Sequence, residues 1–313
     1  MKEELFISGR NIPHVDPHLE VWEFPIALYL FLGGLAAGIL IFSAIVFLLN
    51  KQDKLPASAK WAPLIVPFAL VIGLFALFID LSHKLYVWRL YTTIRIESPM
   101  SWGAWVLLVV TPLSILWVFT DLRSLFPKLD YKYSIIYKFE AIVIKYKKVI
   151  AWAIIPLSLI LGIYTGILLS AFNARPLWNN AILGPLFLIS GLSAAAAAII
   201  LFAKSNYERH LFSKIDIILI IVEIGLLIHL IMGYYAGNEM QVEAVKILIG
   251  GELTTMFFGI LFILGLLFPL ILEIFELMGY KVPVIIPAIL ILTGGLIFRY
   301  LIVEAGQLTR ILY

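Results

Sequence analysis

The stretch IALYLFLGGLAAG, from Ile26 to Gly38, lies inside an apolar run that continues almost without interruption to Asn50. Its one hydroxyl group, on Tyr29, is surrounded by residues with little or no side chain. A helix rises about 1.5 Å per residue and the hydrocarbon core of a bilayer is about 30 Å thick, so about 20 apolar residues can cross it. The run therefore predicts a transmembrane helix.

The rest of the chain has the same character. Of its 313 residues, 62% are hydrophobic and only 14% are charged, and the mean hydropathy is +1.03. No water-soluble domain has this composition. We therefore predict one integral membrane domain over residues 1–313, an all-α bundle of about eight transmembrane helices that contacts lipid and binds no nucleic acid. The predicted spans are 23–49, 61–81, 102–119, 149–171, 180–203, 215–235, 251–275 and 283–303.

Two features of the sequence limit its processing and chemistry. The first 22 residues carry charges and two prolines, and the apolar run after them lacks an A-x-A cleavage site, so we expect the first helix to be retained. The chain has no cysteine, which excludes disulfides, cysteine nucleophiles and thiolate ligands to an iron–sulfur cluster within it. Any cluster that supplies electrons must belong to another subunit.

The positive charges predict the orientation of the helices. Lysine and arginine gather after the first, third and fifth spans, in segments 51–60, 120–148 and 204–214. Loops rich in these residues stay in the cytoplasm. We therefore predict a multi-pass protein of a prokaryotic inner membrane with both termini outside. The segment 120–148 is interpreted as a solvated loop, with an interaction helix as the alternative.

Small residues in the first span allow two interpretations. Gly34 and Gly38 form a G-x-x-x-G pair, which lets two helix backbones approach closely in lipid. A flat cofactor ring against the helix would need the same absence of side chains. Both interpretations stay open at this stage, and the second makes the two glycines candidates for a cofactor site.

Polar residues in several spans reach a similar depth. Counted from the predicted outer ends, Tyr29, Tyr164 and His229 each lie about 9–10 Å into the membrane, at 1.5 Å per residue. Asp80, His83 and Glu252 stand near the same boundary, and Glu223 lies near mid-depth. Each has a structural alternative: tyrosines anchor helices at the interface, and carboxyls or histidines bond neighbouring helices. Their convergence from several helices predicts a pocket that opens outward.

Several stretches resemble the NrfD/polysulfide reductase membrane-subunit family. They are YLFLGGLAAG from Tyr29, DLSHK from Asp80, SPMSWGAW from Ser98, YTGILLSAFNARPLWNN from Tyr164 and GELTTMFFGILFILGLLFPLILE from Gly251. Together they extend over nearly the whole chain. The resemblance implies eight helices in two four-helix bundles, without haem, that exchange electrons with a quinone, either menaquinone or ubiquinone.

The resemblance also implies partners and residue roles. An iron–sulfur subunit would dock on the outer face and connect to a molybdopterin or multihaem catalytic subunit that carries the terminal active site. Tyr164 matches the fourth-helix tyrosine whose hydroxyl meets a quinone carbonyl. Tyr29 falls where such proteins can have a histidine, and Ile26 stands where the pattern has an asparagine.

A quinone takes up two electrons and two protons, so its site needs hydrogen-bond donors, a proton relay and an apolar slot. We therefore predict quinone binding by Tyr29, Gly34, Gly38, Tyr164 and His229. The candidates for proton relay are Asp80, His83, Glu223 and Glu252. We expect no metal in this chain.

Two other functions fit the sequence less well. A secondary transporter or proton-conducting protein would also place charges in its spans, but transporters use interrupted helices at mid-membrane, and no matching pair of broken segments is visible here. A di-haem cytochrome b needs facing pairs of axial histidines. Only His83 and His229 lie in or near spans, and both are near one face, which makes two haems impossible.

Overall fold

The computed structural model describes residues 22–309, which form helices and no strands. Eight of these helices are long and apolar enough to span a membrane, which confirms the predicted number. The spans are α2 (Phe24–Leu48), the continuous run of η1 (Ala57–Trp61), η2 (Ala62–Leu64) and α3 (Ile65–Asp80), then α5 (Pro99–Phe119), α7 (Ser134–Ser170), α8 (Leu183–Phe202), α9 (Asn206–Tyr235), the run of η4 (Met256–Leu267) and α11 (Phe268–Leu277), and α12 (Ile285–Leu308). The short helices η3 (Lys84–Tyr86), α4 (Arg89–Thr92), α6 (Leu122–Leu125) and α10 (Glu239–Lys246) lie between them.

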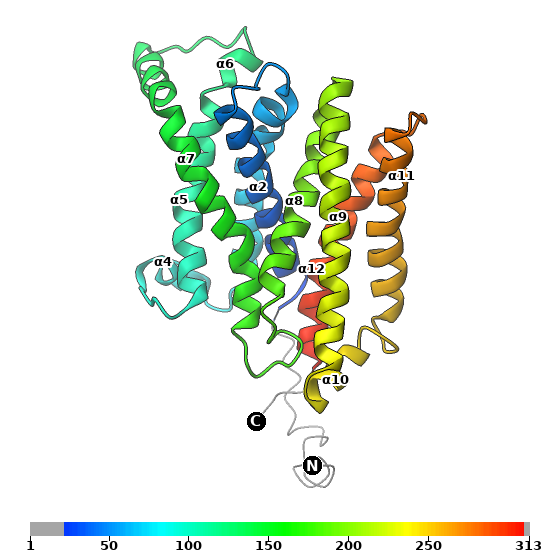
Figure 1. Ribbon diagram of the computed structural model, residues 1–313. Helices are drawn as coiled ribbons and strands as arrows, with labels where there is room; N and C mark the ends of the chain where they lie inside the picture. Colours follow the sequence, from blue (N-terminus) through cyan, green and yellow to red (C-terminus); the bar gives the residue numbers. More distant parts are fainter. Residues whose placement is uncertain (1–21, 310–313) are drawn as a thin grey trace.

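The spans pack as two groups of four (Figure 1). In the first half, α2 packs against α3 and α7, and α5 packs against α7 and α3. In the second half, α8 packs against α9 and α12, while the span of η4 and α11 packs against α9 and α12. We call these groups the first half and the second half. The division into two bundles, expected from the family resemblance, is present in the structure.

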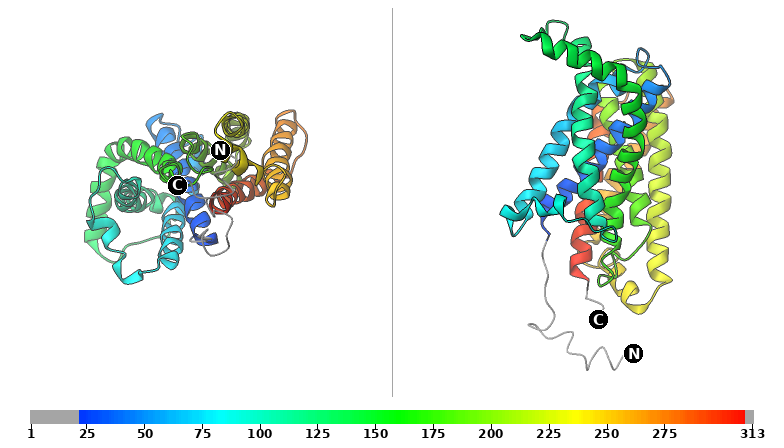
Figure 2. Two further views of the ribbon diagram at one scale, coloured as in Figure 1. Left: turned by 90° about the horizontal axis from the view of Figure 1, so that it is seen from below. Right: turned by 90° about the vertical axis from the view of Figure 1, so that its left-hand side faces the viewer.

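The two ends of the bundle differ in the elements that they carry. The lower end in Figure 1 carries α4 and α10, and the upper end carries α6 (Figures 1 and 2). We call them the α4 end and the α6 end. Helix α2 begins and α12 ends at the α4 end, as an even number of crossings requires. The three basic segments of the sequence connect spans at the opposite end, the α6 end.

The halves meet where small residues let two helices touch. A Cβ atom on Gly38 of α2 would lie 2.6 Å from Ala195 Cβ and 2.7 Å from the Gly191 carbonyl oxygen of α8. One turn earlier, a Cβ on Gly34 would lie 3.6 Å from Gly191 Cα. Close backbone contact of this kind is what small residues provide in lipid, where packing drives helix association. The G-x-x-x-G pair is therefore used to join α2 to α8.

Helices α7 and α9 extend furthest beyond the spans that hydropathy predicted. Helix α7 begins at Ser134, so the second part of the segment 120–148 is helical and the prediction of a solvated loop is wrong there. Arg123 forms an ion pair with Glu140 at 2.9 Å, and Lys147 forms one with Asp121 at 2.6 Å, which fixes the extension against the preceding loop. Hydropathy detects only the part of a helix that lies in lipid, so a basic extension beyond it is missed.

Helix α9 likewise begins at Asn206 instead of residue 215. The carboxylate of Glu208, in its first turn, accepts hydrogen bonds from the backbone N–H groups of Ala57 at 3.0 Å and Ser58 at 2.8 Å. Those groups belong to the start of η1 and have no partner within it, because the first turn of any helix leaves N–H groups free. Glu208, which lies outside the predicted span 215–235, is thus part of the packed bundle.

A clamp at the α4 end ties the beginning of α2 to the end of α12. The Trp22 backbone N–H donates to Gln307 Oε1 at 2.8 Å, and Gln307 Nε2 donates to the Trp22 carbonyl at 2.7 Å. Arg175 Nη1 donates to the Gln307 carbonyl at 2.9 Å, and Trp178 Nε1 donates to the Ile302 carbonyl at 2.7 Å. The stretch after Tyr164 that resembles the family therefore connects the start of α2, the loop after α7 and the end of α12 by hydrogen bonds.

Candidate functional site

A cavity of about 200 Å³ lies within the first half, near the α4 end. All four spans of this half contribute to it, together with the loop that contains α4. Its wall is mostly apolar, and its polar side chains are few. The lining residues with hydroxyl or carboxyl groups are Tyr29, Asp80, Ser82, Tyr91 and Tyr164.

Two buried tyrosines meet at this cavity. Tyr29 of α2 is 7% exposed and Tyr164 of α7 is 3% exposed, and their hydroxyl groups share a hydrogen bond. The ring of Tyr164 lies against Gly103 of α5, where an added Cβ atom would overlap Tyr164 Cε2. Any larger residue at this position would displace the ring. The glycine in the SPMSWGAW run therefore positions the tyrosine of the YTGILLS run.

Asp80 and Tyr91 provide further polar groups. Asp80, the last residue of α3, is half-buried, and its carboxyl group accepts a hydrogen bond from the backbone N–H of Glu23 at the start of α2. A carboxylate at a helix N-terminus is favoured by the free N–H groups and the helix dipole. Tyr91 lies on α4, and burial raises the pKa of its hydroxyl, which therefore remains a neutral donor at physiological pH.

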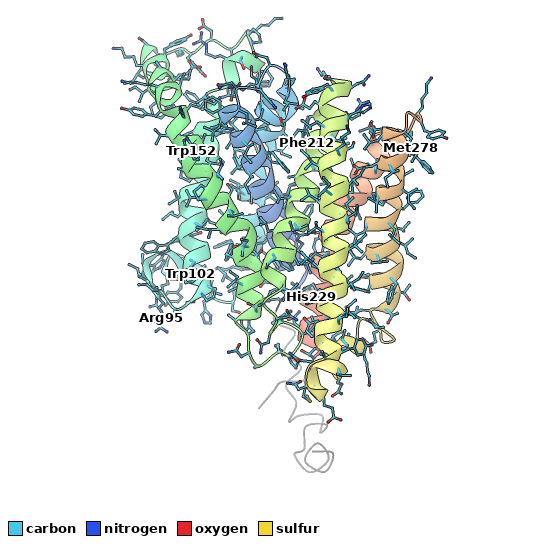
Figure 3. All side chains as sticks on the ribbon, in the orientation of Figure 1. Arg95, Trp102, Trp152, Phe212, His229 and Met278 are labelled. Atoms are coloured by element: carbon cyan, nitrogen blue, oxygen red, sulfur yellow. The ribbon has the colours of Figure 1, made fainter. Side chains whose placement is uncertain are left out.

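The cavity adjoins an open pocket at the α4 end, which we call the mouth. Its volume is about 470 Å³, and it shares Leu81, Ser82, Leu90 and Met100 with the cavity. His83 lines the mouth together with Arg89 and Arg95. Figure 3 places Arg95 on the loop of α4, near Trp102 at the start of α5. Polar groups thus continue from the tyrosine pair to the surface.

An apolar groove is also lined by Tyr164. It has a volume of about 520 Å³, and its lining comes from α5 and α7, including Trp102, Trp105, Ile160 and Ile163. Tyr164 lines both the groove and the cavity. This tyrosine therefore borders both the cavity with polar groups and an apolar surface depression between two membrane-spanning helices.

The structure brings together some of the predicted residues and separates others. Tyr29, Tyr164 and Asp80 line one cavity, and His83 lines its mouth. His229 lies on α9 in the second half, where its side chain is exposed on the outer surface of the bundle (Figure 3). His229 lies at about the same depth as the two tyrosines, but it faces away from the cavity. Equal depth in the membrane therefore did not imply a shared site.

The remaining candidates also lie outside the cavity lining. Gly34 and Gly38 face α8, so they serve helix packing. Glu252 is exposed beside a separate surface pocket that precedes η4. Glu223 is buried in α9 and faces Arg299 of α12. Because α12 runs to Leu308, past the predicted end at residue 303, Arg299 lies deeper than its place in the sequence indicated.

Sequence reasoning did not single out Tyr91. It lies on a four-residue helix outside every apolar span, so neither depth nor hydropathy marks it. One signal could have found it. Tyr91 follows the DLSHK stretch by only a few residues, so a short loop can fold it back over the end of α3.

The all-helical fold with eight spans and a polar-ended cavity defines a multi-pass membrane protein. The family model described as Polysulphide reductase, NrfD matches residues 13–311. The chain therefore belongs to the NrfD family.

Curated relatives agree with this assignment. Protein NrfD of Escherichia coli (strain K12) is 31% identical over 304 residues, which is 92% of this chain and 96% of that protein. The C chain of the polysulfide reductase of Wolinella succinogenes is 30% identical over 310 residues, which is 92% of this chain and 94% of that protein. The NrfD homolog of Haemophilus influenzae is 29% identical over 316 residues, with 95% and 98% coverage.

Proposed function

We propose that this protein is the quinone-reactive membrane subunit of an oxidoreductase complex. The observation that carries the proposal is the buried hydroxyl pair of Tyr29 and Tyr164 at the wall of an apolar cavity inside the membrane domain. Membership of the NrfD family, and similarity to one subunit of a polysulfide reductase, support a role within a reductase complex.

The residues fit a quinone in three respects. The cavity is lined mainly by apolar side chains and can enclose a small ring, while the groove beyond Tyr164 offers an apolar surface for a chain of hydrocarbon units. The two hydroxyl groups can donate hydrogen bonds to carbonyl oxygens. The carboxyl group of Asp80 can exchange protons. A bound quinone would supply two-electron, two-proton redox chemistry.

Within this proposal, the residues of the protein hold oxygens and move protons. Tyr29 and Tyr164 orient carbonyl oxygens, and Tyr91 is a third neutral donor. Asp80 stands between the cavity and the mouth, so it can pass a proton to or from solvent, with His83 as the next titratable group. The wall of apolar side chains keeps other water out. Glu223 and Glu252 stay hypotheses as relays, since neither lines the cavity.

We propose that an iron–sulfur subunit docks over the mouth on the outer face and exchanges electrons with the quinone. The mouth carries Arg89 and Arg95, and the loop around it exposes large apolar side chains, including Leu85, Trp88 and Ile96. Arginine and aromatic residues are enriched in protein interfaces. Through that subunit, electrons would reach a molybdopterin or multihaem catalytic subunit, which carries the terminal active site.

The proposal is tested by Tyr164→Phe in membranes that contain the assembled complex. The variant keeps the ring against Gly103 and loses only the hydroxyl, so the protein should fold. A lost hydrogen bond to a reacting group weakens turnover by roughly 10- to 100-fold if it contributes about 1.5–3 kcal/mol. Tyr235→Phe, an exposed tyrosine at the end of α9, is the matched control.

The measurements are quinone turnover, binding of a quinone analogue and the amount of quinone that co-purifies. Unchanged turnover and binding in Tyr164→Phe would remove this residue from the site. Loss of assembly in both tyrosine variants would instead mean that the substitutions act on folding.

A further inference from the structure

The second half contains a layer of buried carboxyl groups that takes no part in the tyrosine cavity. Asp216 of α9 is 0% exposed and Glu273 of α11 is 1% exposed. The two carboxyl groups are close enough to influence each other electrostatically. Burying two carboxylates side by side in a membrane protein is costly unless a charge or a proton compensates them.

The hydrogen bonds around this pair are incomplete in a specific way. Asp216 Oδ1 accepts a hydrogen bond from Ser193 Oγ of α8 at 2.6 Å. Asp216 Oδ2 and Glu273 Oε2 are fully enclosed, and neither accepts a hydrogen bond from any N–H or O–H group within residues 22–309. Ser213 Oγ, one turn before Asp216, is also buried without a partner in that range. Carboxylates cannot donate to each other, so one proton between them would satisfy both.

The neighbouring charged groups differ on the two sides of the pair. Towards the α6 end lies Glu276, one turn further along α11, and Arg209 and His210 of α9 face it. Towards the middle of the bundle, Glu223 faces both Asp216 and Arg299. Helix α9 also carries Glu208, which accepts from Ala57 and Ser58, and the exposed Lys214, and α12 carries Glu304 towards the α4 end. Within residues 22–309, no cation forms an ion pair with Asp216 or Glu273.

Arg299 is occupied by other partners. Its Nη1 donates to Ser190 Oγ at 2.5 Å and to the Gly295 carbonyl at 3.0 Å, and its Nη2 donates to the Phe187 carbonyl at 2.9 Å. Its charge therefore offsets Glu223, one layer away from Asp216. The pair of Asp216 and Glu273 is left with one serine donor and with two buried oxygens, Asp216 Oδ2 and Glu273 Oε2, that accept no hydrogen bond within residues 22–309.

We propose that Asp216 and Glu273 form a proton-binding site in the second half, reached from the α6 end through Glu276. The pair holds one exchangeable proton between Oδ2 and Oε2, and taking up that proton changes its charge from −2 to −1. The next acid in the series is Glu223, towards the middle of the membrane. The site does not depend on what occupies the tyrosine cavity.

A proton suits this site better than a metal ion. Calcium takes about six to eight oxygen ligands and magnesium needs an octahedral set. Within the part of the chain that the structure describes, no group of three or more His, Asp or Glu side chains could hold a metal. Two carboxyls and two serine hydroxyls offer too few ligands for such an ion.

The test is labelling with dicyclohexylcarbodiimide, an apolar reagent that reacts with protonated carboxyl groups. Membranes with the assembled complex are treated at several pH values, and labelled peptides are identified by mass spectrometry. We expect labelling at Asp216 or Glu273 that falls as pH rises and the shared proton leaves. Asp216→Asn and Glu273→Gln should each shift or abolish it, whereas Asp53→Asn, an exposed residue between α2 and η1, should leave it unchanged.

Absence of label on both residues in the folded wild-type protein would overturn the proposal. Protection by sodium ions at constant pH would also overturn it, because a metal ion would then be the occupant. If the two variants fail to assemble, the pH-dependent label on the wild-type protein still decides the question. None of these readouts uses quinone turnover, so they are independent of the tyrosine site.

Discussion

The two halves of the molecule place polar groups in a membrane in different ways. The first half gathers hydroxyls and one half-buried carboxyl at a cavity that continues into the mouth at the α4 end. The second half encloses carboxyls and one guanidinium between packed helices, with Arg299 and Asp216 each no more than 1% exposed. Neutral donors suit a site that must admit and release a ligand. Enclosed charges suit a site that exchanges only protons.

Three glycines show two different uses of a missing side chain. In the first half, Gly103 makes room for the ring of Tyr164, so the missing side chain shapes a cavity wall. In the second half, Gly265 and Gly294 face each other, and a Cβ on Gly265 would lie 2.8 Å from Gly294 Cα. There the missing side chains allow α12 to approach η4. At Gly103 the missing side chain admits an aromatic ring, whereas at Gly265 and Gly294, as at Gly38, it admits a neighbouring helix.

The strongest test of this comparison is Arg299→Leu. Removing the guanidinium takes away the buried positive charge that acts on Glu223 and leaves the acceptors on Ser190, Gly295 and Phe187 without their donor. Leaving one of two buried opposite charges uncompensated costs about 3–5 kcal/mol. We expect little folded protein, measured by the yield of monodisperse protein and by thermal unfolding in detergent.

Two matched variants sharpen the result. Arg299→Leu combined with Glu223→Leu should recover part of the stability, because two apolar side chains then replace two buried opposite charges. Glu223→Gln alone should retain the packing, and slower proton-coupled turnover in this variant would support a relay role for Glu223. If Arg299→Leu is as stable as the wild type, the second half does not depend on this pair.

The joint between the halves is tested by Gly38→Ala. The added Cβ would lie 2.6 Å from Ala195 Cβ and 2.7 Å from the Gly191 carbonyl oxygen, so α2 and α8 must move apart. Overpacking of this kind costs about 1–3 kcal/mol. The measurement is the midpoint of thermal unfolding.

Gly33→Ala is the control, since no atom lies within 4 Å of the added Cβ at that position. Because alanine favours helix over glycine by about 1 kcal/mol, this variant should be neutral or slightly stabilised. Equal destabilisation by both substitutions would show that the contact with α8 is not the cause.

The smallest effect on the protein is expected from single cysteines that report orientation. The protein has none of its own, so a cysteine at exposed Leu85, near α4, or at exposed Tyr133, before α7, is unique. If the mouth faces outward, a membrane-impermeant maleimide should label Leu85→Cys in intact cells and Tyr133→Cys only after lysis. The opposite pattern would place the mouth on the cytoplasmic side.

Much of the fold could be predicted from the sequence because a span in lipid needs a long apolar run, and eight such runs are present. The pairing of Tyr29 with Tyr164 was also accessible, through their equal depth and the family resemblance. Helix ends were less predictable: α7 and α9 extend beyond lipid as charged turns that ion pairs and hydrogen bonds hold in place.

The faces of the helices could not be predicted in the same way. A soluble helix has one apolar stripe, but a membrane helix is apolar all round, so His229 and Tyr29 looked equivalent. Asp216 was overlooked because it stands at the edge of the predicted span 215–235, whereas α9 begins at Asn206 and carries it inside the bundle. The depth of a residue along a membrane helix can be counted from the sequence. The side of the helix on which it lies is known only once the neighbouring helices are placed.

The clamp between Trp22 and Gln307 has a consequence for how the helices are connected. Its two hydrogen bonds place the start of α2 beside the end of α12, so the first and last spans are neighbours in space. Circular permutation succeeds where the ends of a domain lie close together and the new break falls in an exposed loop. The exposed segment between α6 and α7 is such a loop, and a polypeptide that starts at α7 would need no rearrangement of the bundle. The first and last spans thus adjoin, and the order in which the helices are synthesised is one of several that the same packing allows.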